Sequence, residues 1–306
     1  MYVGSITDVK GLLVGHAQDT TGMTGVSVIL APNGAVCGVD VRGSAPGTRE
    51  TDFMAQAKTV TSANAILLAG GSAFGLAAAD GVMIYCEQQQ MGVHTLDAYV
   101  PIVPAAVIYD LGFGRSDLRP NAGMGYAACI NAGIKVPQGS IGVGMGATVG
   151  KVLGMEYAQK GGVGTASITM PNGACVGVIV AVNALGDVLD NGFIVAGAHK
   201  NGAYIGTSNY LMQNPVLKDQ FIGTNTTIGV VATNVALSKD DATKLAQVAH
   251  DGLARAIDPI HTASDGDTMF AMSYGDKKAD MNALVAAVIE VTRRAVVNAV
   301  TIGVKP

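Results

Sequence analysis

Residues 225–234, with the sequence NTTIGVVATN, constrain the fold more than any other stretch of the chain. The run is rich in β-branched residues and lies between Gly223 and Ser238, which is typical of a buried strand. Its polar start is unusual, because the hydroxyls of Thr226 and Thr227 need hydrogen-bond partners once they leave water. Two interpretations follow. Either both threonines are ordinary strand residues bonded to backbone, or Thr226 is a nucleophile whose own α-amine, freed by chain cleavage, is the general base.

The remaining elements are not in strict β-α alternation, which indicates an α+β layered fold in a single domain. Two Pro-Asn-Gly tripeptides, at 32–34 and 171–173, predict tight turns, each joining two strands into an antiparallel hairpin. Ser72 is a natural N-cap for one helix, and Ser238 for another whose first turn is acidic. The strands are predicted at 24–31, 36–42, 63–69, 102–109, 165–170, 174–183, 225–234 and 268–274, and the helices at 72–90, around 126–128, after Ser238 to about 257, and at 279–300.

The composition narrows the class of protein. Only 14% of the 306 residues are charged, 49% are hydrophobic, and 41 are glycines, so we expect other subunits to cover much of the surface, in a homo-oligomer. The net charge of −4 gives no electrostatic basis for binding nucleic acid or an anionic membrane. No apolar run is long enough to span a bilayer, and no secretory signal is visible, so we expect a cytoplasmic protein. The four cysteines are expected to be buried thiols: Cys37, Cys86, Cys129 and Cys175.

Several segments together resemble the DmpA/BapA family of self-processing N-terminal-nucleophile amidohydrolases, which includes β-peptidyl aminopeptidases and nylon-oligomer hydrolases. They lie along nearly the whole chain, at 24–30, 40–43, 46–52, 70–75, 225–234, 249–257, 261–262 and 265–268. The resemblance implies a four-layer α/β/β/α sandwich of the type found in DmpA and ornithine acetyltransferase. It also implies cleavage between Asn225 and Thr226, into residues 1–225 and 226–306. Thr227 is the competing nucleophile, and Thr226 is favoured because it lies six positions before Ala232, as in the family.

Two acidic residues, Asp265 and Asp267, are candidates for orienting the nucleophile and for taking part in proton transfer to and from it. Taken alone, Asp-Gly-Asp is more typical of a turn before a strand, and the resemblance favours the catalytic role. Asn183 ends an apolar strand, where its amide is either an ordinary strand-ending group or a donor to the oxyanion, the role that the resemblance implies.

Tyr109 and Lys151 are the remaining candidate catalytic residues. Tyr109 ends a predicted strand, and Lys151 closes a glycine-rich stretch, where a lysine can lower a neighbouring pKa and stabilise negative charge. The resemblance to the nylon-hydrolase branch implies that both are pocket residues. Their alternatives are a packed strand-end tyrosine and a solvated loop lysine, and Lys160 is the rival of Lys151.

Other patterns are weaker. The glycines at 142–147 lack the acidic residue that a dinucleotide site requires. The loop at 70–74 fails the GxSxG pattern because Phe74 occupies its last position. The five histidines show neither zinc-ligand spacing nor a Ser-His arrangement, and His250 is expected to be structural.

The sequence therefore predicts an autoprocessing amide hydrolase that needs no cofactor or metal. Its expected substrates are short peptides or peptide-like amides, which makes it an aminopeptidase, a β-aminopeptidase or a 6-aminohexanoate-oligomer hydrolase. The expected assembly is a tetramer of processed heterodimers. Two alternatives stay open: an acyltransferase of the same fold, and an unprocessed oligomer without catalytic activity.

Overall fold

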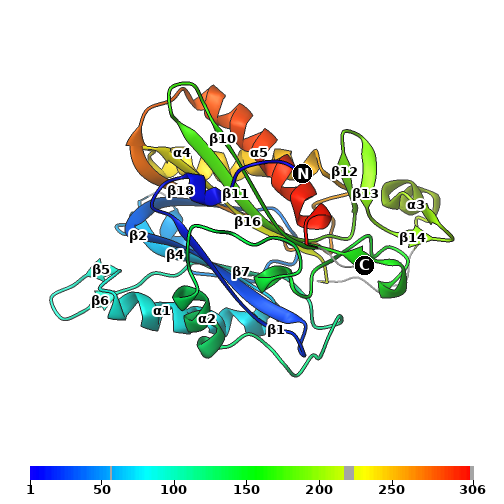
Figure 1. Cartoon of the computed structure of the whole chain (residues 1–306), viewed down its shortest axis with the longest axis horizontal. Helices are drawn as coiled ribbons and strands as arrows, with labels where there is room; N and C mark the ends of the chain where they lie inside the picture. The colour runs from blue at the N-terminus through cyan, green and yellow to red at the C-terminus, as the bar shows by residue number, and fades with distance from the viewer. Residues whose placement is uncertain (56, 217–223, 304–306) are drawn as a thin grey trace.

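The computed structural model describes residues 1–55, 57–216 and 224–303. A nine-stranded sheet and the helices α1, α2, α4 and α5 form the body of the molecule, and α3 lies at its periphery beside β14 (Figure 1). The sheet comprises β1 (Leu13–Asp19), β2 (Thr24–Val41), β3 (Thr48–Arg49), β4 (Ser62–Ala69), β7 (Ala105–Val107), β10 (Gly162–Thr169), β11 (Cys175–Asn183), β16 (Thr226–Val235) and β18 (Thr268–Lys277). The helices are α1 (Ala78–Gln88), α2 (Ala122–Ile130), α3 (Thr207–Gln213), α4 (Lys239–Ala254) and α5 (Met281–Thr301).

Short strands pair outside this sheet and carry the peripheral loops. They are β5 (Val93–His94) with β6 (Tyr99–Val100), β8 (Thr148–Val149) with β9 (Gln159–Lys160), β14 (His199–Lys200) with β15 (Ala203–Tyr204), and β12 (Asp187–Asp190) with both β13 (Phe193–Ala196) and β17 (Ile257–Asp258).

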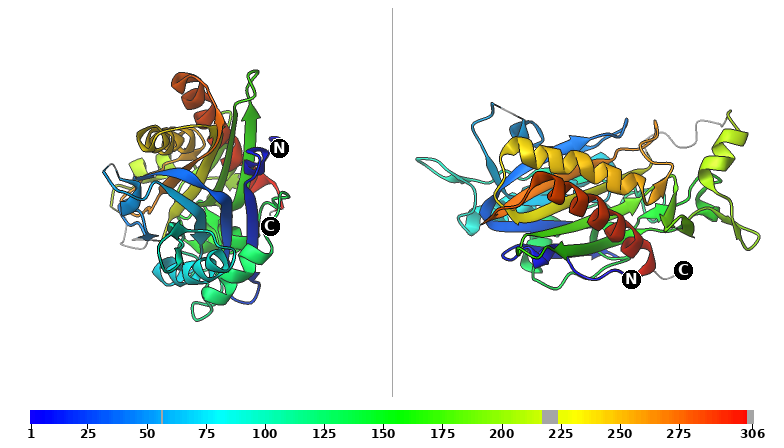
Figure 2. Two further views of the ribbon diagram at one scale, coloured as in Figure 1. Left: turned by 90° about the vertical axis from the view of Figure 1, so that its left-hand side faces the viewer. Right: turned by 90° about the horizontal axis from the view of Figure 1, so that it is seen from above.

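The long strand β2 joins two halves of the sheet. Its first part pairs with β1 and its last part with β18, while β4 pairs with both parts. Apolar side chains fill three spaces: between α4/α5 and the β10–β18 half, between the two halves, and between the β1–β7 half and α1/α2. Figure 2 shows the two helix pairs on opposite sides of the strands. The molecule is thus an α/β/β/α sandwich, which confirms the predicted fold.

Strand β11 illustrates why the sequences of the central strands are unbroken apolar runs. Val176, Val178, Val180 and Val182 face α4 and α5, whereas Ile179 and Ala181 face the space between the halves. All nine residues of the strand are buried. A strand covered on both faces has no solvent side, so it needs no alternation with polar residues.

The two Pro-Asn-Gly tripeptides have different structures. At 171–173 the prediction is confirmed: the Gly173 N–H donates to the Met170 carbonyl (2.9 Å), and β10 and β11 form an antiparallel hairpin. At 32–34 the predicted hairpin is wrong, because the chain continues in one direction along β4 and the tripeptide is an irregularity within β2. The Asn64 Nδ2 donates to the carbonyls of Ala31 (3.3 Å) and Pro32 (3.1 Å), groups that a regular ladder would have paired.

The N-cap predicted at Ser72 is also wrong. Ser72 has a φ of +54° inside a 3-10 segment (Ser72–Ala77), and its N–H donates to the Ile108 carbonyl (2.9 Å). The α-helix begins only at Ala78, without a side-chain cap. Ser238 does cap α4, since its Oγ accepts the Asp241 N–H (3.1 Å). The strand predicted at 102–109 is limited to β7.

The pairing of β16 with β18 determines where the site lies. The two strands are parallel, and α4 connects the end of β16 to the segment before β18. Parallel strands start at the same edge of a sheet, so the start of β16 at Thr226 lies beside the residues that precede Thr268. An isolated parallel bridge joins Asn225 directly to Asp265.

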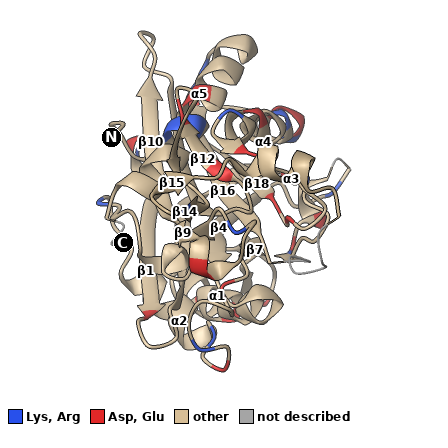
Figure 3. Cartoon of the chain, turned by 90° about the vertical axis from the view of Figure 1, so that its right-hand side faces the viewer, with Lys and Arg blue, Asp and Glu red and all other residues tan. Residues whose placement is uncertain are grey.

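Charged residues are sparse along the chain, and those of opposite sign are interspersed on the ribbon (Figure 3). No helix within the described ranges is long and apolar enough to cross a membrane. Cys37, Cys86, Cys129 and Cys175 are all buried free thiols, as predicted.

Candidate active site

The bond between Asn225 and Thr226 lies at the centre of the site. Thr226 is only 4% exposed, and its Oγ1 donates to the carbonyl oxygen of Asn225. The same oxygen accepts the backbone N–H of Gly266 (3.0 Å). Two donors therefore polarise the carbonyl that precedes Thr226, and one of them is the hydroxyl of Thr226 itself. A side chain at position 266 would crowd this arrangement, since its Cβ would lie 2.9 Å from Thr226 Oγ1.

The two acidic residues have different environments. Asp267 Oδ1 accepts the Thr227 N–H (2.5 Å), and its Oδ2 accepts from the backbone N–H (3.2 Å) and Nδ1 (2.8 Å) of His261. Asp265 Oδ2 accepts the Thr262 N–H (2.7 Å), while its Oδ1 is buried and has no partner among the described residues. Burial, and next the charge of Asp267, raise the pKa of Asp265. Asp265 is thus the carboxyl placed to take up and release a proton near neutral pH.

Lys151 is a buried amine on the other side of the site. Its Nζ donates to the carbonyls of Asn183 (3.0 Å) and Thr224 (3.2 Å) and to Asn183 Oδ1 (3.0 Å). Burial lowers its pKa from 10.5 to about 7, although the nearby Asp265 acts in the opposite direction. A lysine with such a pKa exchanges its proton at neutral pH, which a solvated lysine does not.

The Asn183 amide is held at both ends. Its Oδ1 accepts the backbone N–H of Thr148 (3.0 Å) in addition to the Lys151 bond. Its Nδ2 donates to the carbonyls of Tyr109 (3.0 Å) and Thr224 (3.3 Å). Because β11 pairs with β16 so that Asn183 lies opposite Thr226, this N–H₂ group is fixed beside the start of β16. Both of its hydrogens are bonded to carbonyls in the uncut chain, so it can donate to negative charge that develops there when one of these two bonds opens.

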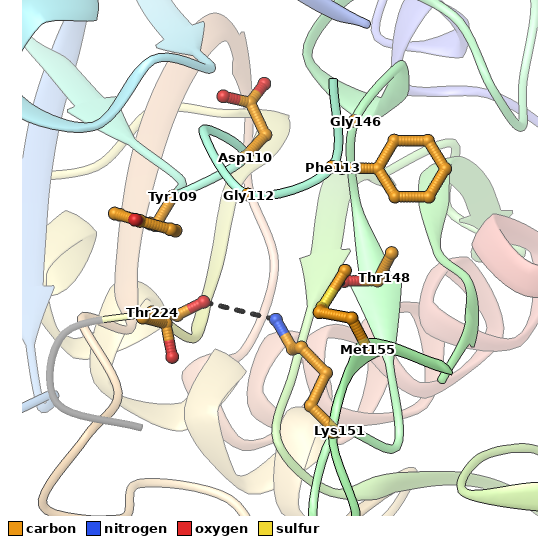
Figure 4. A pocket seen from close by; sticks show the side chains of 10 residues that line it. Tyr109, Asp110, Gly112, Phe113, Gly146, Thr148, Lys151, Met155 and Thr224 are labelled. Atoms are coloured by element: carbon orange, nitrogen blue, oxygen red, sulfur yellow. Dashed lines mark hydrogen bonds between the residues drawn. The ribbon is translucent and has the colours of Figure 1, made fainter. Parts of the chain in front are cut away.

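A cavity of about 250 Å³ opens beside these groups. Figure 4 shows the Lys151 amine reaching toward the Thr224 carbonyl, with Tyr109 near Thr224 and with Phe113 and Met155 on the other side. The cavity is lined by Tyr109, Asp110, Gly112, Phe113, Gly146, Thr148, Lys151, Gly154, Met155 and Thr224. The Asp110 carboxylate points away from this group (Figure 4) and accepts from Thr24 Oγ1 (2.7 Å) and from the Gly71 N–H (2.7 Å).

The structure brings the predicted residues together. Thr226, Asp265, Asp267, Asn183 and Lys151 surround the bond after Asn225, and Tyr109 contributes its carbonyl and a wall of the cavity.

Lys160, the rival of Lys151, is bonded elsewhere, to the carbonyls of Met145 (2.7 Å) and Ala147 (3.0 Å).

Three residues of the site were missed from the sequence: Gly266, Thr148 and His261. Gly266 and Thr148 act through backbone N–H groups, for which a sequence carries no side-chain signal. Within the described ranges, no group of three or more His, Cys, Asp or Glu side chains is arranged to hold a metal ion.

Residues 4–305 match peptidase family S58. An uncharacterized aminopeptidase of Mycobacterium bovis is 45% identical over 294 residues, which cover 89% of this chain and 82% of the relative. A 6-aminohexanoate-oligomer endohydrolase of Kocuria sp. is 33% identical over 277 residues, covering 87% and 74%, respectively.

Among solved structures, the L-aminopeptidase D-Ala-esterase/amidase of Ochrobactrum anthropi has a TM-score of 0.75 at 20% identity and covers 98% of this chain and 87% of its own. It is described as a variant of the N-terminal-nucleophile (Ntn) hydrolase fold. A Burkholderia sp. β-aminopeptidase has a TM-score of 0.70 at 22% identity, covering 96% and 85%. The chain therefore belongs to peptidase family S58 and is a hydrolase of peptide or amide bonds with the N-terminal-nucleophile hydrolase fold.

Proposed function

We propose that the chain cuts itself between Asn225 and Thr226, and that Thr226 then hydrolyses short peptides or peptide-like amides as an N-terminal nucleophile. The observation that carries this proposal is the contact between Thr226 Oγ1 and the Asn225 carbonyl, which the Gly266 N–H also polarises. An ordinary strand threonine bonded to backbone has no need of a second donor on the same oxygen, or of two buried carboxyls beside it.

Self-cleavage begins when Thr226 Oγ1 attacks the carbonyl carbon of Asn225. The Gly266 N–H stabilises the oxyanion of the tetrahedral intermediate. The C–N bond then breaks, the nitrogen takes a proton and becomes the α-amine of Thr226, and an ester joins Asn225 to Oγ1. Water hydrolyses this ester, which leaves a carboxylate on Asn225 and restores the hydroxyl of Thr226.

Turnover repeats this chemistry on a substrate. The α-amine of Thr226 accepts the hydroxyl proton as Oγ1 attacks the substrate carbonyl, and it returns the proton to the leaving amine. Asn183 Nδ2 is the donor to the oxyanion, and Asp267 holds the backbone of Thr227 in place. Asp265 and Lys151 are the groups whose shifted pKa values allow them to exchange protons with the new amine at neutral pH. Water then releases the acyl group from Thr226.

The size of the cavity and the names of the relatives support small amide substrates. The volume of about 250 Å³ is just below the ~300–1,000 Å³ typical of sites for drug-sized ligands. An aminopeptidase and a 6-aminohexanoate-oligomer hydrolase are among the relatives. We therefore propose the amino-terminal residue of a short peptide, or an aminohexanoyl amide, as the acyl part of the substrate.

Mass spectrometry of the purified protein tests this proposal directly. The parent should give two masses, for residues 1–225 and 226–306, and Thr226→Ala a single full-length mass with no turnover of aminoacyl or aminohexanoyl amides. Thr227→Val is the matched control, because it removes a buried hydroxyl that has no partner among the described residues; it should be cut and active like the parent. The proposal is wrong if Thr226→Ala hydrolyses these amides as fast as the parent. An intact, inactive parent would instead favour the unprocessed oligomer.

The proposed assembly is a tetramer of processed heterodimers. Light scattering on the native protein should then give four times the mass of one chain, and a monomer would contradict it.

A further inference from the structure

We propose that His261 is a positioning residue of this site: its ring holds the Asp267 carboxylate in the orientation in which Asp267 binds the Thr227 N–H, next to the nucleophile. The inference rests on the proposed role of Thr226, and it assigns a function to a histidine that forms no metal site or Ser-His pair.

The contacts run in a chain from His261 to the start of β16. His261 Nδ1 lies 2.8 Å from Asp267 Oδ2, and its backbone N–H donates to the same oxygen (3.2 Å). The other carboxylate oxygen accepts the Thr227 N–H (2.5 Å). A carboxylate bonded at both oxygens has one orientation left, so rotation of the Asp267 side chain would release the backbone that follows Thr226.

The ring of His261 is itself fixed from the opposite side. It packs edge to face on the His250 ring, with a centroid distance of 4.8 Å. His250 is fully buried on α4, and its Nε2 bonds to the Asp40 carbonyl of β2 (3.1 Å). The His261 ring is thus seated against α4 and, through His250, against β2; residues of neither element are among those that line the described cavity.

The hydrogen bonds also determine where the His261 proton lies. The carboxylate accepts, so Nδ1 carries the proton and donates it. The Nε2 atom is buried and has no partner among the described residues. A proton on Nε2 alone would leave a buried N–H unpaired and would take from Nδ1 the hydrogen that Asp267 accepts. A proton on Nδ1 therefore satisfies the ring best, and it supplies the donor that the Asp267 carboxylate accepts.

Two substitutions of the same shape test this role. His261 has a φ of +58°, a region in which Asn and Asp are also tolerated. In His261→Asn the amide nitrogen takes the place of Nδ1 and can still donate to Asp267. In His261→Asp the donor is replaced by an acceptor with the same charge as Asp267. Each variant is examined for the fraction of chain that is cut, the thermal midpoint, and kcat and KM per cut chain.

We expect His261→Asp to be cut slowly and to lose ~10- to 100-fold in kcat, the range for one hydrogen bond to a charged group. KM should change little, because His261 is not among the residues that line the cavity. His261→Asn should retain most of the parent's kcat. A merely structural role would lower the thermal midpoint in both variants without separating their kcat values.

The inference is overturned if His261→Asp is cut and turns over like the parent, or if both variants lose kcat equally. If His261→Asp does not fold, failure of His261→Asn to retain kcat in a folded protein overturns it as well. The Thr226→Ala assay decides the proposed function separately: an inactive Thr226→Ala together with a fully active His261→Asp would reject only the role of His261.

Discussion

Lys151 offers a stability test that depends on pH. Its side chain is almost fully buried, and burial lowers its pKa from 10.5 to about 7. The substitution Lys151→Met removes the titrating group and leaves an unbranched side chain that is one heavy atom shorter. Both proteins should carry Thr226→Ala, so that a single intact chain unfolds in each case.

The sign follows from proton binding. Between pH 7 and 10.5, the unfolded chain holds a proton on Lys151 that the folded chain has lost, so the unfolding free energy of the lysine protein rises with pH. The slope approaches ~1.4 kcal/mol per pH unit inside this window and vanishes below it, where both states are protonated. Relative to Lys151→Met, the lysine protein should gain about 2.5 kcal/mol between pH 6 and pH 9.

Urea unfolding of both proteins at several pH values measures this gain. Asp265 titrates nearby and interacts with Lys151, so the pair is repeated with Asp265→Asn in both proteins. The gain should persist there, because loss of the negative partner lowers the pKa of Lys151 further. A difference in unfolding free energy that stays constant from pH 6 to pH 9 would refute the reasoning, since it would mean that Lys151 has an ordinary pKa in the folded protein.

Four further substitutions and one control have expected outcomes. Asn183→Ala should lower kcat ~10²- to 10³-fold, as loss of an oxyanion donor does; a kcat within tenfold of the parent's would exclude that role. Gly266→Ala should leave much of the chain uncut in mass spectra, because its Cβ would lie 2.6 Å from the Ala45 carbonyl oxygen and 2.9 Å from Thr226 Oγ1. Gly133→Ala is its control, with no atom within 4 Å of the new Cβ, and should be cut normally. Tyr109→Phe should be cut like the parent, since Asn183 bonds to the Tyr109 carbonyl and not to its hydroxyl; slow cutting would give the hydroxyl a part in that step. Ser238→Ala should lower the unfolding free energy by ~1 kcal/mol through loss of the α4 cap, and unchanged urea unfolding would contradict this.

The sequence predicts elements well where local signals and tertiary context agree. The capped helix α4, the apolar strand β11 and the strand β16 are examples. The repeated Pro-Asn-Gly shows the limit. The same three residues close a hairpin at 171–173 but interrupt a continuous strand at 32–34. The difference lies in Asn64, which bonds to the carbonyls of Ala31 and Pro32, and in the pairing with β4, which resumes at Ala35 after the irregularity. A short window of sequence contains neither.

The sequence identifies the candidate side chains of the site better than it identifies the contacts between them. Thr226, Asp265 and Asp267 could be named because they are polar residues at the ends of predicted strands, in a pattern that resembles a known family. One donor to the Asn225 carbonyl is the backbone N–H of Gly266. A backbone donor cannot be predicted from the type of residue at that position. His261 lies six positions before Asp267 in a loop, where the spacing of two residues does not indicate whether their side chains meet. Only the fold shows that its ring turns back onto that carboxylate.

The place of β16 between β11 and β18 has a consequence for the order of events. Residues before 226 supply Asn183 and Lys151, and residues after it supply Gly266 and Asp267, so neither product of the cut contains all of these groups. Cleavage would then have to wait until the segments on both sides of Thr226 have folded together, so a cut chain would be evidence that they had done so. Afterwards the two products would remain interleaved, so that native chromatography would not distinguish them from the uncut precursor.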